Sequence, residues 1–315
     1  MVSVRDKATK AKESFIILSN AKTEDKNHAL LLMAEALDKN REIIIETNKL
    51  DIADAKKSLE RGELTSSLVK RLEVTDSKID EMINGIKDVI KLEDPVGKTI
   101  NNLELDSGLE LYQVVTPIGL IGMVFESRPD VIPQIISLAL KSGNSVLLKG
   151  GKESAKTNKA IYEVLIDSID ENSIPRGAFQ LLEKREDVTE MLKLDKYIDL
   201  IIPRGSNEFV KFVQSNTKIP VLGHADGICH IYVDGIYDEK KALEVCFDAK
   251  TQYPAVCNAV ETLLINEKSA EEFLPKIGKM YKNANVEMRC CDRSLKILKN
   301  FEVKRAEEND WSTEY

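Results

Sequence analysis

The first 90 residues have the apolar pattern of helices, with hydrophobic positions three and four apart among Lys and Glu. Pro and Gly are almost absent from this stretch. Thr75 is a suitable N-cap for a helix that continues through Ile79, Met82 and Ile86. No pattern of catalytic or ligand-binding residues is visible here, so these helices are predicted to serve packing.

The pattern changes to alternation after Pro95. Apolar residues alternate with polar ones on both sides of the turn sequence Asp106-Ser107-Gly108, which predicts a hairpin of two half-exposed strands. An extended hairpin offers an edge with which another subunit can pair. Residues 103–117 are therefore predicted to be an oligomerisation hairpin, and the protein a homo-oligomer, a dimer or larger.

From residue 116 onward, short apolar strands alternate with amphipathic helices. Strands are predicted at 120–125, 145–148, 179–182, 198–202, 221–222 and 228–233, and helices at 131–141, 154–168, 188–194 and 206–215. This order predicts an α/β fold with a parallel, doubly wound sheet. In such a sheet the ligand binds outside the carboxyl ends of the strands.

Two strand ends have features that suit a phosphate-bearing ligand. Strand 145–148 is followed by Lys149, Gly150 and Gly151, and strand 198–202 by the Arg204-Gly205-Ser206 turn, each just before a helix. Glycine lets a ligand approach the backbone, and a helix N-terminus favours an anion. Together the loops predict a dinucleotide site, although the Gly-x-Gly-x-x-Gly fingerprint is absent and each loop alone is explained by its turn.

The strand at 120–125 ends in Glu126-Ser127-Arg128-Pro129. Ser127 and Pro129 are explained by the start of the next helix. That reading leaves Arg128 unexplained. Its planar guanidinium suits a carboxylate or a phosphate.

Cys257 lies in a Pro-bearing turn between a predicted helix at 242–249 and a predicted strand at 260–265. A thiol held there can be a nucleophile if its surroundings favour the thiolate, while a buried structural Cys is the alternative. The five cysteines show no Cys-x-x-Cys spacing, which favours reduced thiols. His224, Cys229 and His230 lack zinc-ligand spacing, so no metal is expected.

Composition narrows the function classes. The net charge of −8 and the lack of a long basic run argue against nucleic-acid binding. No stretch of 18 uninterrupted apolar residues and no secretory signal are present, so a cytoplasmic protein without a membrane partner is expected. A length of 315 residues predicts two domains.

Five ordered motifs resemble one family. They lie at 117–129, 141–153, 202–206, 223–234 and 253–262, and include Glu-Ser-Arg-Pro and His-x-x-Gly-x-Cys-His. These motifs resemble the γ-glutamyl phosphate reductases, the proline-biosynthesis branch of the aldehyde dehydrogenase superfamily. The resemblance implies NADPH-dependent reduction of L-glutamate 5-phosphate to L-glutamate 5-semialdehyde, and a functional link to glutamate 5-kinase.

The resemblance also assigns roles. It implies that Cys257 attacks the acyl phosphate, with its own backbone N–H and the Ser127 side chain stabilising the oxyanion. The general-base Glu of hydrolytic aldehyde dehydrogenases falls at Val221, which cannot activate water against a thioester. The predicted substrate-binding residues are Glu126, Arg128 and Asn258, and the predicted cofactor-binding residues are Lys149, Gly150, Arg204, Gly205 and Ser206.

An aldehyde-dehydrogenase-like domain organisation follows from the resemblance. Residues 1–102 and 118–250 would form the NADPH-binding domain with its N-terminal helices, and 251–315 a partial α/β catalytic domain. Members of the family continue beyond the position of residue 315, so the chain is expected to be truncated relative to them. Two alternatives stay open: an inactive paralogue that retains nucleotide binding, and an acylating aldehyde dehydrogenase with another acyl substrate.

Overall fold

The computed structural model describes residues 2–126, 128–223, 227–254, 256 and 258–315. The chain divides into two compact units, residues 1–224 and 225–315. The predicted boundary at 250/251 is later in the chain than this division. The reason is that β7 (Cys229–Val233) pairs in parallel with β8 (Val260–Ile265), so the intervening helix α10 (Glu239–Thr251) belongs with both strands.

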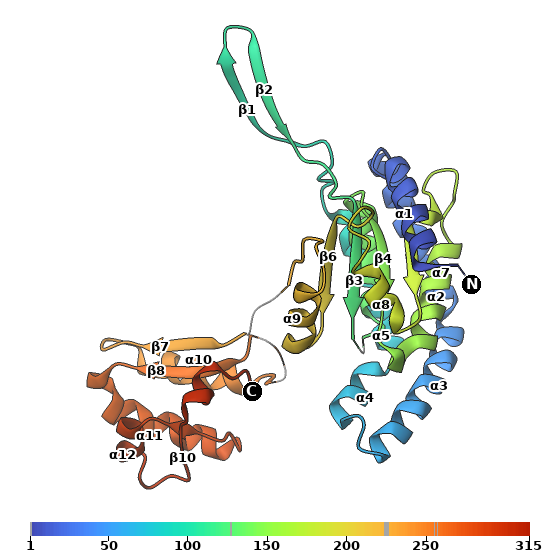
Figure 1. Ribbon diagram of the computed structural model, residues 1–315. Coiled ribbons are helices and arrows are strands. Elements are labelled where there is room, and N and C mark those ends of the chain that lie inside the picture. Colours follow the sequence, from blue (N-terminus) through green and yellow to red (C-terminus); the bar gives the residue numbers. More distant parts are fainter. Residues whose placement is uncertain (1, 127, 224–226, 255, 257) are drawn as a thin grey trace. The chain divides into compact units, whose positions relative to one another are not determined.

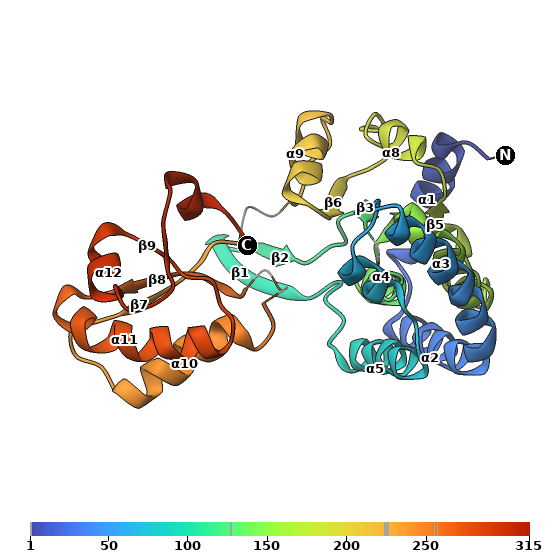
Figure 2. The same ribbon diagram turned by 90° about the horizontal axis from the view of Figure 1, so that it is seen from below.

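The predicted helical region is confirmed in the first unit. It contains α1 (Val4–Leu18), α2 (Thr23–Lys39), α3 (Arg41–Glu60), α4 (Ser66–Leu72) and α5 (Asp76–Lys91). The Thr75 side chain accepts a hydrogen bond from the backbone N–H of Lys78 and so caps α5, as predicted. Helices α2 and α5 lie side by side (Figure 2), and their apolar faces form part of the main hydrophobic core.

The central sheet of this unit is parallel, with strand order β5-β4-β3-β6. Its strands are β3 (Leu120–Phe125), β4 (Ser145–Lys149), β5 (Phe179–Leu182) and β6 (Leu200–Arg204). The connecting helices are α6 (Val131–Lys141), α7 (Ala155–Asp167), α8 (Glu186–Met191) and α9 (Asn207–Ser215). The predicted doubly wound α/β fold is therefore confirmed, with β6 beginning two residues later than expected.

Helices cover both faces of this sheet (Figure 1). Val146 and Leu148 of β4 pack into a core with α2, α5, α6 and α7, whereas Leu147 points to the opposite face and packs with α1, α8 and α9. Along the chain, β4 and then β5 are added on one side of β3, and β6 is added on its other side. The crevice between the carboxyl ends of β3 and β6 is thus the topological switch point, where ligands bind in such sheets.

A long hairpin extends away from the sheet of the first unit (Figure 1). It consists of β1 (Thr99–Asp106) and β2 (Leu109–Val114), which pair in antiparallel register with Leu103 opposite Leu111. Every residue of both strands is exposed. The hairpin around Asp106-Ser107-Gly108 is confirmed, and its strands begin four residues before the predicted range.

The second unit surrounds the parallel pair β7 and β8. It also contains α11 (Glu267–Asn283), β9 (Arg289–Cys290), α12 (Asp292–Ile297) and β10 (Lys304–Arg305), with a final 3₁₀ turn at Glu308–Ser312. Helices α10 and α11 pack together through a core that includes Cys246, Phe273 and Tyr281. The Tyr281 hydroxyl donates to the Cys246 carbonyl over 2.8 Å, which satisfies a polar group inside this core.

Candidate active site

The carboxyl ends of three neighbouring strands bring predicted site residues together. Val124 of β3 lies opposite Lys149 on β4 and Pro203 on β6. The backbone N–H of Glu126 donates to the Arg204 carbonyl over 3.2 Å. The predicted residues gathered at this edge are Glu126, Lys149, Gly150, Arg204, Gly205 and Ser206.

The turn after β4 is closely packed against side chains of this unit. A Cβ on Gly150 would lie 2.3 Å from Nδ2 of Asn158 and 3.0 Å from the ring of Phe125. Glycine is therefore required because the protein's own side chains approach the backbone here. Lys149 is buried and donates from Nζ to the Gly150 carbonyl. Burial lowers the pKa of the Lys149 ammonium, and the carboxylates of Asp187 and Glu153 offset this only in part.

The helix N-terminus that follows this turn already has an anionic cap. Thr157, in the first turn of α7, donates from its backbone N–H and its hydroxyl to Oδ2 of Asp51, over 2.8 and 2.7 Å. Asp51 belongs to α3 and is buried. The sequence pattern predicted that this helix N-terminus favours a phosphate. At Thr157 that prediction is corrected, because the backbone N–H and the hydroxyl already donate to a carboxylate of the same chain.

The turn after β6 lies at the switch point. A Cβ on Gly205 would lie 2.9 Å from Oε2 of Glu126 and 3.1 Å from Phe209. The Ser206 hydroxyl caps α9 by accepting a hydrogen bond from the backbone N–H of Phe209 over 3.3 Å. The predicted substrate-binding Glu126 therefore contacts the predicted cofactor turn. Its exposed carboxylate adds negative charge beside Gly205.

The loop after β3 supplies a half-exposed guanidinium. Nη2 of Arg128 lies 3.4 Å from Oδ2 of Asp130, and Nζ of Lys78 lies 3.9 Å from the same oxygen. Nζ of Lys78 also lies 3.5 Å from Oε2 of Glu81, so Lys78 has two carboxylate partners. The exposed part of the Arg128 guanidinium can still contact an anionic ligand. The predicted catalytic Ser127, which precedes Arg128, lies outside the described residues.

The predicted nucleophile Cys257 also lies outside the described residues, but the elements on either side of it match expectation. Helix α10 ends at Thr251, and β8 begins at Val260, its predicted first residue. Asn258 is exposed, whereas Ala259 and Val260 are buried. Nζ of Lys250 lies 3.1 Å from Oε2 of Glu261. This ion pair joins the end of the helix to the start of the strand.

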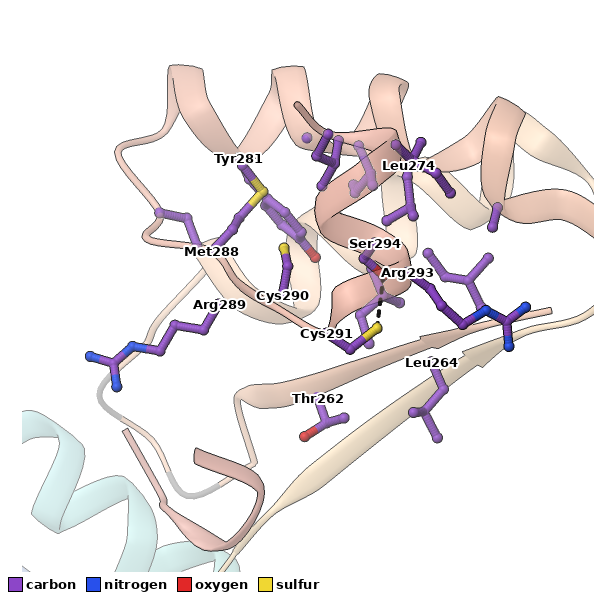
Figure 3. A pocket seen from close by; sticks show the side chains of 18 of the residues that line it. Thr262, Leu264, Leu274, Tyr281, Met288, Arg289, Cys290, Cys291, Arg293 and Ser294 are labelled. Atoms are coloured by element: carbon purple, nitrogen blue, oxygen red, sulfur yellow. Dashed lines mark hydrogen bonds between the residues drawn. The ribbon is translucent and has the colours of Figure 1, made fainter. Parts of the chain in front are cut away.

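A cavity of about 540 Å³ in the second unit lies between β8, α11 and residues 286–291 (Figure 3). None of the predicted site residues that the structure describes lines it. Cys291 does, with Sγ 3.4 Å from the Ser294 hydroxyl. Burial raises the pKa of this thiol, but hydrogen bonds from Ser294 and nearby backbone N–H groups outweigh burial and lower it.

The histidines take no part in a metal site among the residues that can be described. His28 is exposed, and Nδ1 of His230 lies 2.7 Å from the Ile228 carbonyl. His224 lies outside the described residues. Within the ranges given above, no three His, Cys, Asp or Glu side chains come together in a way that could hold a metal ion.

The sequence pattern did not indicate three residues that pack around the turn after β4 and the start of α7, namely Phe125, Asn158 and Asp51. Their roles arise from contacts between distant segments, such as the Asp51–Thr157 hydrogen bonds. Asn158 in particular reads in the sequence as an ordinary polar residue in the first turns of a helix.

Comparison with known proteins agrees with this architecture. The aldehyde dehydrogenase family model matches residues 2–294. The chain is 56% identical to a γ-glutamyl phosphate reductase of Methanococcoides burtonii over 99% of its length and 70% of that protein. It is 50% identical to the corresponding protein of Pelotomaculum thermopropionicum, over 100% of this chain and 71% of that one. Among the described helices, none is both long and apolar enough to cross a membrane.

Solved structures lead to the same family. A crystal structure of γ-glutamyl phosphate reductase from Thermotoga maritima superposes with a TM-score of 0.94 at 42% identity, covering 99% of this chain and 75% of that one. An acetylating aldehyde dehydrogenase from Geobacillus thermoglucosidasius, at 17% identity and a TM-score of 0.59, shares the fold over 99% of this chain and 72% of that one. The chain therefore belongs to the aldehyde dehydrogenase family and, within it, to the γ-glutamyl phosphate reductases.

Proposed function

We propose that the chain reduces L-glutamate 5-phosphate to L-glutamate 5-semialdehyde with NADPH and releases phosphate. The observation that carries this proposal is the 56% identity to a γ-glutamyl phosphate reductase over 99% of the chain. The aldehyde dehydrogenase family uses NAD or NADP. Two cationic side chains at the carboxyl edge of the sheet, Lys149 at the end of β4 and Arg204 at the end of β6, support such a dinucleotide site.

In the proposed reaction the Cys257 thiolate attacks the acyl carbon, and the C–O bond to phosphate breaks with its electron pair leaving on phosphate. The backbone N–H of Cys257 and the Ser127 hydroxyl hold the oxyanion that forms in this step. Arg128 stabilises the negative charge of the leaving phosphate or of the substrate carboxylate. Glu126 and Asn258 complete the proposed substrate contacts.

The remaining steps require hydride and the exclusion of water. Bound NADPH supplies the hydride that reduces the thioacyl group. Lys149, Gly150, Arg204, Gly205 and Ser206 bind and orient the dinucleotide. Val221, whose backbone pairs with Ile201 beside β6, carries an apolar side chain where hydrolytic relatives have a base, so it does not activate water against the thioester.

The test is the reverse reaction on the purified chain. NADPH formation from L-glutamate 5-semialdehyde and NADP is measured with and without inorganic phosphate. Strict dependence on phosphate is the expected result, because phosphate must cleave the thioacyl enzyme. Turnover that instead requires another acyl acceptor would identify an acylating aldehyde dehydrogenase, and binding of NADPH without any turnover would favour a non-catalytic paralogue.

Affinity for NADPH is expected to weaken as the pH rises. Because the pKa of Lys149 is lowered from 10.5 by burial, its ammonium is present below that lowered pKa and is lost above it. Fluorescence titration with NADPH between about pH 7 and pH 10 measures the profile. Lys149→Arg keeps its charge in this range and is expected to flatten the decline. An equal decline in both proteins would contradict the prediction.

The hairpin is proposed to join subunits into a homo-oligomer. Leucines 103, 105, 109 and 111 lie exposed on it, and Leu103 pairs with Leu111 on one face. Such an apolar face on an extended ribbon without a core partner is typical of an interface. Leu103→Glu with Leu111→Glu is expected to reduce the assembly size in light scattering, while the circular dichroism spectrum of the folded subunit is retained. Glu110→Gln, on the other face, is the control, and an unchanged size for the leucine variant would contradict the proposal.

A further inference from the structure

Asn158 has a buried amide oxygen without a hydrogen-bond partner. The side chain is 3% exposed and lies in the first turns of α7. Nδ2 donates to the Ser154 hydroxyl over 3.0 Å, while Oδ1 has no partner within the part of the chain that the structure describes. Since leaving a buried acceptor unpaired is costly, such an atom in a native protein calls for a partner that is supplied under working conditions.

Its location distinguishes this atom from the other unpartnered buried atom among the described residues. That atom is Oγ of Ser145, the first residue of β4 and so at the edge of the sheet opposite the strand ends. The Asn158 carboxamide that carries Oδ1 instead packs against Gly150, immediately after the last residue of the same strand, and its Nδ2 is the atom nearest to a Cβ built on that glycine. Only Asn158 therefore lies at the edge where ligands bind in parallel sheets.

A donor with unused capacity borders the same glycine. The Lys149 ammonium carries three N–H groups, and one of them is donated to the carbonyl of Gly150. The Asp51 carboxylate accepts hydrogen bonds from Thr157 and so offsets the partial positive charge at the N-terminus of α7, which follows this turn. Asn158 and Lys149 are thus two polar side chains at Gly150 with hydrogen-bonding capacity left over.

We propose that Asn158 is a positioning residue for cofactor binding that acts through Lys149. In the free protein the ammonium rests on the Gly150 carbonyl. When the dinucleotide binds, the ammonium leaves that carbonyl, donates one N–H to Oδ1 of Asn158 and directs another to an acceptor oxygen of the cofactor. This inference rests on the proposed function and adds to it a residue that holds the Lys149 ammonium where it can contact the cofactor.

The experiment is a double-mutant cycle on the full 315-residue chain, with the dissociation constant for NADPH measured by fluorescence. The variants are Asn158→Leu, Lys149→Met, the two combined, and Asn158→Asp, which keeps an acceptor oxygen. Ser145→Ala, at the opposite strand end, is the matched control. Thermal unfolding without cofactor is recorded for each, because a purely structural role would appear there.

Asn158→Leu is expected to weaken NADPH binding about tenfold, as the loss of one hydrogen bond to a charged group implies. In the Lys149→Met background the same change should add less than about twofold, a coupling typical of residues in contact. Asn158→Asp and Ser145→Ala should bind like wild type, and the unfolding temperature of Asn158→Leu should not fall. If leucine prevents folding, Asn158→Ala replaces it with the same expectations.

Three results would overturn the inference while leaving the proposed function intact: wild-type affinity in Asn158→Leu, an additive double mutant, or equal losses in Asn158→Asp and Asn158→Leu. Absence of saturable NADPH binding by the wild type would reject both. Phosphate-dependent turnover with unaltered binding in every Asn158 variant would reject the inference alone.

Discussion

Replacing Cys257 with alanine is expected to lower reductase turnover at least about a thousandfold, because Cys257 is the proposed nucleophile that forms the thioacyl enzyme. Binding of NADPH should be retained, since the proposed cofactor residues belong to the first unit. The measurement is phosphate-dependent NADPH formation, together with an NADPH titration of the same preparation.

The chain supplies a matched control for this thiol. Cys291 is exposed, and hydrogen bonds from Ser294 and nearby backbone N–H groups lower the pKa of its thiol, so a general thiol reagent is expected to modify it readily. Cys291→Ser is expected to keep wild-type turnover. Loss of turnover in Cys291→Ser, or substantial turnover in Cys257→Ala, would assign the nucleophile elsewhere. Cys246 is a poor control, because it is buried in the core of the second unit.

Replacing Gly119 with alanine is expected to destabilise the first unit by about 3 kcal/mol or more. Gly119 has a φ of +134°, which side-chain-bearing residues rarely adopt, and a Cβ there would lie 2.0 Å from Oδ2 of Asp199. That carboxylate cannot simply move away. It accepts a hydrogen bond from the backbone N–H of Leu120 over 2.7 Å and pairs with Lys12.

Denaturant unfolding followed by circular dichroism measures this effect, and Gly85→Ala is its control. Gly85 lies inside α5, where a Cβ meets nothing within 4 Å, so alanine should stabilise the helix by about 0.5–1 kcal/mol. A stability of Gly119→Ala within about 1 kcal/mol of wild type would show that the backbone adapts around Asp199.

The strands that the sequence predicted most accurately are short apolar runs bounded by turn residues. Strands β3 and β5 have the predicted limits, 120–125 and 179–182. The start of β6 was placed too early because Ile198 is apolar and buried, yet it packs in the core before the strand begins at Leu200. An apolar residue indicates burial, whereas the start of a strand is defined by backbone hydrogen bonds to the neighbouring strand.

Some residues of the candidate site could likewise be predicted from the sequence, and others could not. Lys149 and Arg204 could be predicted to lie at one edge of the sheet, because parallel strands have their carboxyl ends on the same side. Asn158 could not, because its significance depends on the packing of its carboxamide against Gly150 and on an unpaired oxygen. The cap that Asp51 places on α7 likewise joins residues more than a hundred positions apart, a distance at which local patterns carry no signal.

The Lys250–Glu261 ion pair has a consequence for the segment between its members. With side chains only 20% and 5% exposed, the pair holds the two ends of a short loop at a fixed separation before any substrate arrives. Part of the loop-closure entropy is therefore lost during folding. For the substrate contact proposed for Asn258, less ordering entropy then remains to be lost on binding, so the free energy of that contact is less offset.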